Sequence, residues 1–367
     1  SLDALAEDDG AALAVLVGLA FGSDEPPDGQ TFTTSHTTRI AAARRSRRRR
    51  QYTAAGCGLP LTTPRYRAAV PCEDRRAMLT ATEVHTFHDD VLAWFDVNAR
   101  DLPWRRDTSG WSVLVSELML QQTPVVRVLP VFEAWMERWP TPAALAAEPV
   151  GEAVRAWGRL GYPRRAQRLH AAAVAIVADH GGEVPSDHAA LLALPGVGEY
   201  TAAAVASFAF GGRHAVMDTN VRRVFARVVE GRQYPSASVT AAERRLAESL
   251  LPEVDAHRWA AATMELGAVV CTAQAPRCDA CPVRRLCRWR ALGYPEHDGP
   301  PRRGQAWAGT DRMVRGRLMA VLREATEPVD KSLLDAAWDD ESQRERCLDS
   351  LLDDGLVTLH PDGRFSL

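Results

Sequence analysis

Four cysteines stand close together in the second half of the chain, with the spacing C-x6-C-x2-C-x5-C: Cys271, Cys278, Cys281 and Cys287. Thiolates this close can ligate one tetrahedral metal ion or one iron–sulfur cluster. A four-cysteine zinc site more often has two C-x2-C pairs joined by a longer arm, whereas this pattern has only one such pair. We therefore expect an iron–sulfur cluster, with zinc as the alternative. The other cysteines, which stand alone, are expected to be plain thiols: Cys57, Cys72 and Cys347.

A glycine-containing turn precedes an alanine-rich stretch. Its sequence is Leu194-Pro195-Gly196-Val197-Gly198, and Glu199 follows. Two glycines in a tight turn that opens a helix leave backbone N–H groups pointing outwards, where they can hold a phosphate oxygen without a lysine. An ordinary turn between helices is the alternative, and the motif alone leaves both interpretations open.

Two carboxylic acids have surroundings that suit acid–base chemistry. Asp218 follows the turn by about twenty residues and is placed to cap a helix expected over 219–229. The helix dipole stabilises an ionised cap, and a fixed anion there could stabilise a cationic sugar. Glu117 shares a helical face with apolar residues such as Val113 and Leu114, which should help it keep a proton, as a general acid must. A surface glutamate is the alternative for Glu117.

The elements that position these residues are predicted to be helices. Helical spacing of apolar residues runs from Thr82 to about Arg290, and no alternating strand pattern interrupts it. Six prolines divide this stretch into short helices: Pro103, Pro124, Pro140, Pro163, Pro185 and Pro195. We expect an all-α domain over 78–290, with a six-helix part at about 103–211, and a linker over 291–304.

The two ends of the chain differ from this domain. Residues 1–77 lack helical periodicity and are expected to be disordered or a non-native extension, although the basic run Arg44–Arg50 could be a nucleic-acid arm. Residues 305–367 are expected to form a small winged-helix-like α+β module, with helices around 314–323, 331–338 and 342–353 and a hairpin of 356–359 with 364–367. A simple docking appendage is the alternative.

Composition limits the class of protein. The chain has 367 residues, 46% hydrophobic and 25% charged, and a net charge of −3, so bulk electrostatics alone do not indicate nucleic acid. No apolar run reaches the roughly 18 residues of a membrane span. The cysteine pattern does not resemble a secreted disulfide framework, so we expect a protein of the reducing cytoplasm.

Taken in order, the glycine turn, Asp218 and the cysteine loop resemble the endonuclease III/MutY superfamily, over about Leu102–Cys287. The resemblance implies a helix-hairpin-helix DNA glycosylase with a [4Fe–4S] cluster loop. In bifunctional members a lysine after the hairpin attacks the sugar; here that position is Tyr200. Lys331 is the only lysine in the chain and lies in the C-terminal module, so lyase chemistry of this kind is not expected.

Two segments look like the MutY signature: Leu102-Pro103-Trp104-Arg105 and Ser116–Thr123. This resemblance implies a monofunctional glycosylase that excises adenine paired with 8-oxoguanine or guanine in double-stranded DNA. With it we expect a bacterial protein that is associated with the nucleoid and monomeric. Glu117 would protonate adenine at N7, and Asp218 would stabilise the oxocarbenium-like sugar. The remaining implied roles are as follows: Tyr200 and Asn220 complete the sugar face; Trp104 and Arg105 line the adenine pocket; Gln122 and Tyr162 wedge into the duplex; Gly196, Val197 and Gly198 clamp phosphate; and Arg277 contacts another phosphate.

The chain departs from the MutY pattern in three places. The segment after Arg290 has no counterpart of the Nudix-like domain that reads 8-oxoguanine, and Pro124 and Pro163 stand beside the expected wedge residues. Three alternatives remain open. They are a mismatch thymine or uracil glycosylase of the same superfamily, an endonuclease III-like enzyme for oxidised pyrimidines, and a non-enzymatic iron–sulfur DNA-binding regulator.

Overall fold

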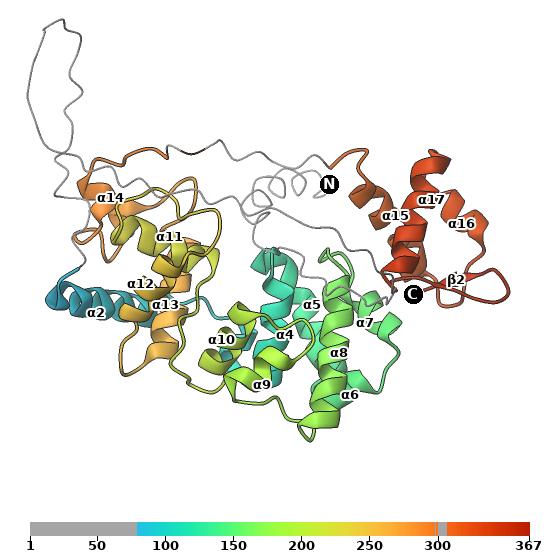
Figure 1. The fold of residues 1–367 in the computed structure, drawn as a ribbon, viewed down its shortest axis with the longest axis horizontal. Helices are drawn as coiled ribbons and strands as arrows, with labels where there is room; N and C mark the ends of the chain where they lie inside the picture. The colour runs from blue at the N-terminus through green and yellow to red at the C-terminus, as the bar shows by residue number, and fades with distance from the viewer. Residues whose placement is uncertain (1–78, 298, 300–306) are drawn as a thin grey trace, which may run out of the picture. The chain divides into compact units, whose positions relative to one another are not determined.

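The computed structural model describes residues 79–297, 299 and 307–367, and in this part of the chain almost every element is a helix (Figure 1). The elements are α2 (Ala81–Asn98), α3 (Pro103–Arg106), α4 (Gly110–Leu120), α5 (Val125–Arg138), α6 (Pro142–Ala146), α7 (Val150–Trp157), α8 (Arg164–Asp179), α9 (His188–Ala193), α10 (Glu199–Phe208), α11 (Thr219–Val228), α12 (Ala241–Ser249), α13 (Ala256–Val269), the 3₁₀ turn η3 (Cys278–Ala280) and α14 (Arg288–Ala291). The predicted all-α class is confirmed. The expectation for residues 1–77 falls outside the described residues, as does part of the expected linker, at 298 and 300–304.

Two hydrophobic cores organise these helices. One core joins α3 through α10 and includes Trp135, Trp157 and Leu169. The other joins α2 to α11, α12, α13 and the cysteine loop, with Phe87 against Trp259 at its centre. Helix α2, the first in the described residues, therefore packs with segments more than a hundred residues further along the chain. Helices α3 through α10 pack mainly against one another, and α10 also packs against α13.

The helix starts follow local sequence chemistry. Thr80 caps the N-terminus of α2, and Thr240 caps that of α12. In each capping box the threonine side chain accepts a hydrogen bond from the backbone N–H of the glutamate three residues later, and the carboxylate of that glutamate accepts one from the threonine backbone N–H. The prolines expected to separate helices do so at α3 and α8, where Pro103 and Pro163 stand at the start. Pro130, by contrast, lies inside α5.

The C-terminal module contains α15 (Asp311–Glu324), α16 (Lys331–Asp335), α17 (Glu341–Asp353) and the antiparallel strands β1 (Thr358–Leu359) and β2 (Phe365–Ser366). Three helices and a hairpin are present, as expected, although the strands are only two residues long. The apolar residues of the module, including Leu318 and Leu351, continue the core of α3–α10.

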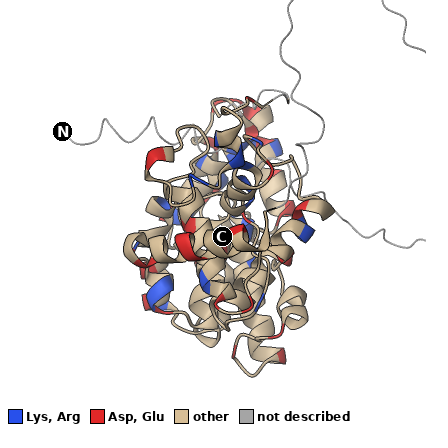
Figure 2. Ribbon diagram, turned by 90° about the vertical axis from the view of Figure 1, so that its left-hand side faces the viewer, with Lys and Arg blue, Asp and Glu red and all other residues tan. Residues whose placement is uncertain are grey.

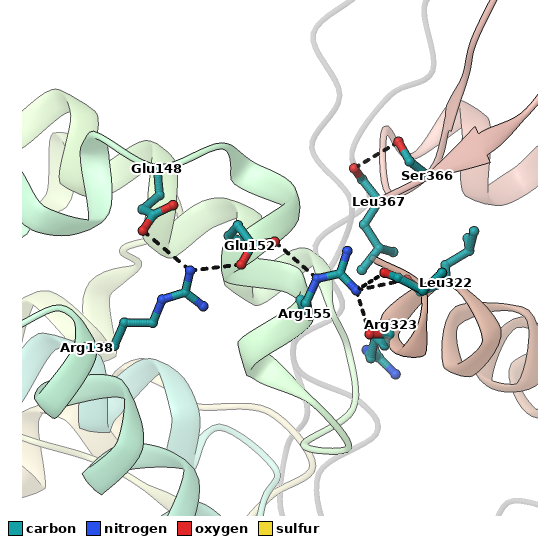
Figure 3. Close-up of polar contacts among 9 residues, drawn as sticks. Arg138, Glu148, Glu152, Arg155, Leu322, Arg323, Ser366 and Leu367 are labelled. Carbon is teal, nitrogen blue, oxygen red and sulfur yellow. Dashed lines mark hydrogen bonds and ion pairs between the residues drawn. The ribbon is translucent and has the colours of Figure 1, made fainter. Parts of the chain in front are cut away.

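One arginine fastens this module to α7 (Figure 3). Nη1 of Arg155 donates to the carbonyl oxygens of Leu322, Arg323 and Ala325 at 3.1, 2.5 and 2.6 Å. These carbonyls end α15 and have no partner within that helix, so the guanidinium satisfies them. Nearby, the backbone of Leu367 lies so close to Gly151 that a β-carbon there would stand 2.6 Å from the Leu367 oxygen.

Charges of both signs are interspersed over the ribbon rather than separated (Figure 2). This distribution agrees with the small net charge, so any affinity for a polyanion must come from local sites. Among the residues described, no helix is long and apolar enough to cross a membrane.

Candidate functional site

Glu117 lies on α4, the most completely buried helix of its core. Nine of the eleven residues of α4 are buried, and Glu117 itself is only 5% exposed. The sequence indicated an apolar face around Glu117, but the structure shows that the helix is covered nearly all round. Burial raises the pKa of Glu117 to about 7, and the nearby Asp218 carboxylate adds to the rise, while a hydrogen bond with Tyr200 and the charge of Arg105 oppose it.

Such a carboxyl group holds its proton near neutral pH and can still release it, as a general acid requires. Tyr200 lies on the first turn of α10, so the residue after the hairpin and the residue on α4 meet. The structure therefore brings together Glu117, Tyr200 and Asp218, which are separated in sequence.

Asp218 caps the N-terminus of α11, as expected. Its Oδ1 accepts from the backbone N–H of Val221 at 2.7 Å and its Oδ2 from Nδ2 of Asn220 at 2.6 Å. Burial raises the pKa of Asp218 from its ordinary value, and these hydrogen bonds and Arg223 oppose the rise. The sequence indicated only the stabilising effect of the cap; desolvation beside Glu117 was not foreseen.

A hydrogen-bonded chain runs from Asp218 towards the cysteine loop. Asn220 donates to Asp218 and accepts at Oδ1 from Nη2 of Arg223 at 2.7 Å. Nε of Arg223 donates to the carbonyl oxygen of Cys271 at 2.7 Å. A β-carbon at Gly267 would stand 2.7 Å from Cβ of Asn220, so this glycine lets α13 approach α11 closely.

Arg105 is held by a carboxylate that the sequence did not reveal. Glu265, on α13, is fully buried and accepts from Nη2 of Arg105 at 2.8 Å and from Nε and Nη2 of Arg100 at 2.7 and 2.8 Å. Burial opposes ionisation of Glu265, but these two hydrogen-bonded arginines outweigh it and lower its pKa to about 2. Trp104, the neighbour of Arg105, is buried edge-on against Phe132, with ring centroids 5.1 Å apart.

The glycine turn is a hairpin between α9 and α10. Gly196 has a φ of 78°, a conformation that favours glycine, and it packs against Arg168 so closely that a β-carbon would lie 2.5 Å from Cβ of that residue. Gly198 caps α10 and has open space at its β position. Val197 is buried and donates to the carbonyl of Leu194. Within the described residues the N–H groups of Gly196 and Gly198 have no backbone acceptor outside the helices, so they remain available to an anion.

Gln122 and Tyr162 share an unusual backbone. Both have a left-handed φ, 54° and 48°, which is uncommon for residues other than glycine. The side chain of Gln122 is exposed, and Tyr162 is 51% exposed. Two polar or aromatic side chains are thus held outwards by strained turns, Gln122 just after α4 and Tyr162 just before α8.

The four clustered cysteines line one pocket together with Arg227, Arg277 and Trp289. Across the residues that the structure describes, no set of three or more His, Cys, Asp or Glu is arranged as a ready metal site. The donor set nevertheless suits a thiophilic metal centre, because four thiols line one pocket. Burial raises the pKa of the Cys281 thiol to about 12; a hydrogen bond from the backbone of Val283 opposes the rise and the neighbouring cysteines add to it. A bound metal would relieve this penalty because it replaces the thiol protons.

Two basic residues near these sites are engaged elsewhere. Nε of Arg277 donates to the carbonyl of Val269 at the end of α13, at 3.1 Å, so its guanidinium faces back to the helix. Nζ of Lys331 is paired with Asp335 and Glu345 at 2.8 and 2.6 Å in the C-terminal module.

Sequence reasoning missed Glu265, Arg223 and the buried Arg165. One signal was present for Glu265, a lone acid in an otherwise apolar stretch of α13. The two arginines donate largely to backbone carbonyl oxygens, and such bonds leave no partner pattern in the sequence.

Comparison with known proteins adds the family. Residues 115–249 match the model of the HhH-GPD superfamily of base excision DNA repair proteins. An adenine DNA glycosylase of Mycobacterium tuberculosis (strain CDC 1551 / Oshkosh) is 54% identical over 286 residues, which are 77% of this chain and 94% of that protein.

Two solved structures have the same fold. A thermostable thymine-DNA glycosylase aligns with a TM-score of 0.52 and 28% identity, over 57% of this chain and 98% of that one. A trapped covalent intermediate of endonuclease III with DNA aligns with a TM-score of 0.52 and 26% identity, over 59% of this chain and 100% of that one.

Proposed function

The chain belongs to the adenine DNA glycosylases of the HhH-GPD superfamily and excises adenine in base excision repair, and we propose that it does so at mispairs with 8-oxoguanine or guanine, by hydrolysis without a lyase step. The observation that carries the mechanism is the buried Glu117, which lies beside Tyr200 and Asp218 and has a pKa of about 7.

In the proposed reaction Glu117 donates its proton to N7 of adenine as the bond between C1′ and N9 breaks. The bonding electrons leave with the protonated base, and positive charge develops on the sugar, where the Asp218 carboxylate stabilises it. Water then adds to C1′ and gives its proton to Glu117, which restores the acid. The products are free adenine and an abasic site. Asn220 and Tyr200 orient the two carboxyl groups.

The lysine content supports the proposed lack of a lysine-dependent strand-cutting step. The only lysine of the chain is Lys331, which is ion-paired in the C-terminal module. No Schiff base can form on a lysine beside Tyr200.

A [4Fe–4S] cluster would be held by Cys271, Cys278, Cys281 and Cys287. It would supply a rigid centre for the loop rather than electrons for base removal. Arg227 stabilises the conformation of this loop, because its guanidinium donates to the carbonyls of Thr272 and Ala273 at 2.7 and 2.9 Å.

Binding of double-stranded DNA would use the hairpin N–H groups of Gly196 and Gly198 for backbone phosphate. Gln122 and Tyr162 would enter the duplex where the adenine is turned out, and Arg105 would line the pocket that receives it. We infer that the protein acts as a monomer on nucleoid DNA in the cytoplasm.

The test uses duplexes that carry one A opposite 8-oxoguanine, one A opposite guanine, or one T opposite guanine. Strand scission is compared with and without hot alkali. We expect scission of the adenine strand only after alkali, and loss of it in Glu117→Gln with DNA binding retained. Product from T opposite guanine, without product from either adenine duplex, would contradict the proposal and favour thymine excision. Unchanged activity in Glu117→Gln would contradict the assigned acid.

A further inference from the structure

Arg165 is a buried arginine that the proposed reaction does not use. It is the second residue of α8 and is 5% exposed, and among the described residues its hydrogen bonds go to backbone carbonyl oxygens and one hydroxyl. Burial lowers its pKa to about 10, which still leaves it protonated at neutral pH. A charged group buried in this way must be satisfied by dipoles.

The two terminal nitrogens of Arg165 serve two different segments. Nη1 donates to the carbonyl oxygens of Leu118 and Met119 at 3.0 and 3.2 Å and to that of Gln121. These carbonyls belong to the last turn of α4 and the residue after it, which a helix cannot satisfy itself. The segment also carries Glu117 and Gln122.

Nη2 faces the segment before α8. It donates to the carbonyl oxygen of Gly161 at 3.0 Å, to that of Leu160 at 3.4 Å, and to Oγ1 of Thr123 at 3.1 Å. The next residue after Gly161 is Tyr162, whose ring lies 5.7 Å from the guanidinium carbon. The guanidinium of Arg165 is therefore hydrogen-bonded both to the turn that carries Gln122 and to the turn that carries Tyr162.

We propose that Arg165 is a positioning residue that holds Gln122 and Tyr162 in register as a two-part wedge, so that an adenine stacked in the duplex can be turned out. The proposal rests on the proposed function, because it assumes that these side chains enter the duplex. Their left-handed backbone angles support it, since strained turns persist only where surrounding contacts hold them.

Lysine cannot replace this arrangement. A lysine keeps the charge but offers one nitrogen, whereas the arginine fork presents two terminal nitrogens to two segments at once. In Arg165→Lys we expect excision from a duplex to fall about ten- to a hundredfold, as the loss of charged hydrogen bonds at one segment implies.

The test compares two substrates under single-turnover conditions. One is adenine paired opposite 8-oxoguanine, and the other is adenine in a single-base bulge, which is already unpaired and so depends less on a wedge. We expect Arg165→Lys to be impaired on the first and within about threefold of the unchanged protein on the second. Combining Arg165→Lys with Tyr162→Ala should add little further loss, because both changes disable the same wedge.

Arg344→Lys is the matched control. Arg344 is 9% exposed and donates to the carbonyl of Trp338 at 2.8 Å, but it lies in the C-terminal module and touches neither turn. We expect it to retain activity on both substrates. The positioning role would be overturned if Arg165→Lys lost the same share of its excision rate on both substrates. It would also be overturned if Arg344→Lys lost as much activity on the paired substrate as Arg165→Lys does. If the unchanged protein excised adenine from neither substrate, the proposed function itself would be overturned.

Discussion

The fall of the excision rate at alkaline pH, the alkaline limb of the pH–rate profile, tests the assignment of Glu117. The group must be protonated to act as an acid, and its pKa is about 7. The protonated fraction is then about 90% at pH 6, about 10% at pH 8 and about 1% at pH 9. The rate of adenine excision should therefore fall about tenfold from pH 6 to pH 8, and about ninefold more by pH 9.

The causes of the shift predict how a variant should move this limb. The hydrogen bond from Tyr200 lowers the pKa of Glu117, so its removal in Tyr200→Phe should raise that pKa further. The alkaline limb should move to higher pH, even if the maximal rate falls. At low pH activity should fall as Asp218 takes a proton, at a pH above its ordinary value because burial raises its pKa.

The assay is single-turnover excision of adenine from a duplex, read as alkali-labile strand product between pH 5 and pH 9.5. Duplex binding is measured across the same range, so that loss of binding is separated from loss of the chemical step. A rate that stays flat between pH 6 and pH 9 with binding intact would refute Glu117 as the acid. A limb that moves to lower pH in Tyr200→Phe would refute the stated origin of its pKa.

Three further predictions concern the supports of the site. Glu265→Gln should lower the free energy of unfolding by about 1–3 kcal/mol at pH 7. The pKa of Glu265 is about 2 in the folded protein and near 4.5 in the unfolded chain, so this difference should be fully present above pH 4.5 and vanish as the pH falls through about 2. Urea titrations at several pH values would show it. Arg155→Ala should weaken the packing of the C-terminal module against α7 by about 1–3 kcal/mol of free energy. Limited proteolysis within 307–367 should then be faster, and an unchanged cleavage rate would contradict the docking role of Arg155. Cys281→Ser should lower bound iron and sulfide and the visible absorption of the purified protein, whereas Cys347→Ser should leave all three unchanged.

The features that the sequence predicted well are local. The glycine turn and the Asp218 cap each depend on a few neighbouring residues. The helices of the C-terminal module were also placed within a few residues, except that α16 ends at Asp335 rather than near Trp338. Periodicity and capping are enough for such elements.

The features that the sequence could not predict depend on distant segments. Arg105 and Glu265 are separated by 160 residues, and the sequence around each residue does not indicate that the other is its partner. The left-handed turn at Tyr162 is likewise invisible, because a tyrosine in sequence suggests no such backbone angle. The pKa of Glu117 required the positions of Tyr200 and Asp218, which only the assembled helices provide.

The pairing of α2 with α13 has a consequence for the order in which the protein folds during synthesis. The core of α3–α10 is contiguous, so most of it can form once those residues have emerged from the ribosome. The core around Phe87 and Trp259 closes a loop of about 170 residues and must wait for α13. Until then the apolar face of α2 has only part of its native contacts, those with α11 and α12. The core that carries Asp218 and the cysteines is therefore completed after most of the core that carries Glu117, to which the C-terminal module adds its residues last.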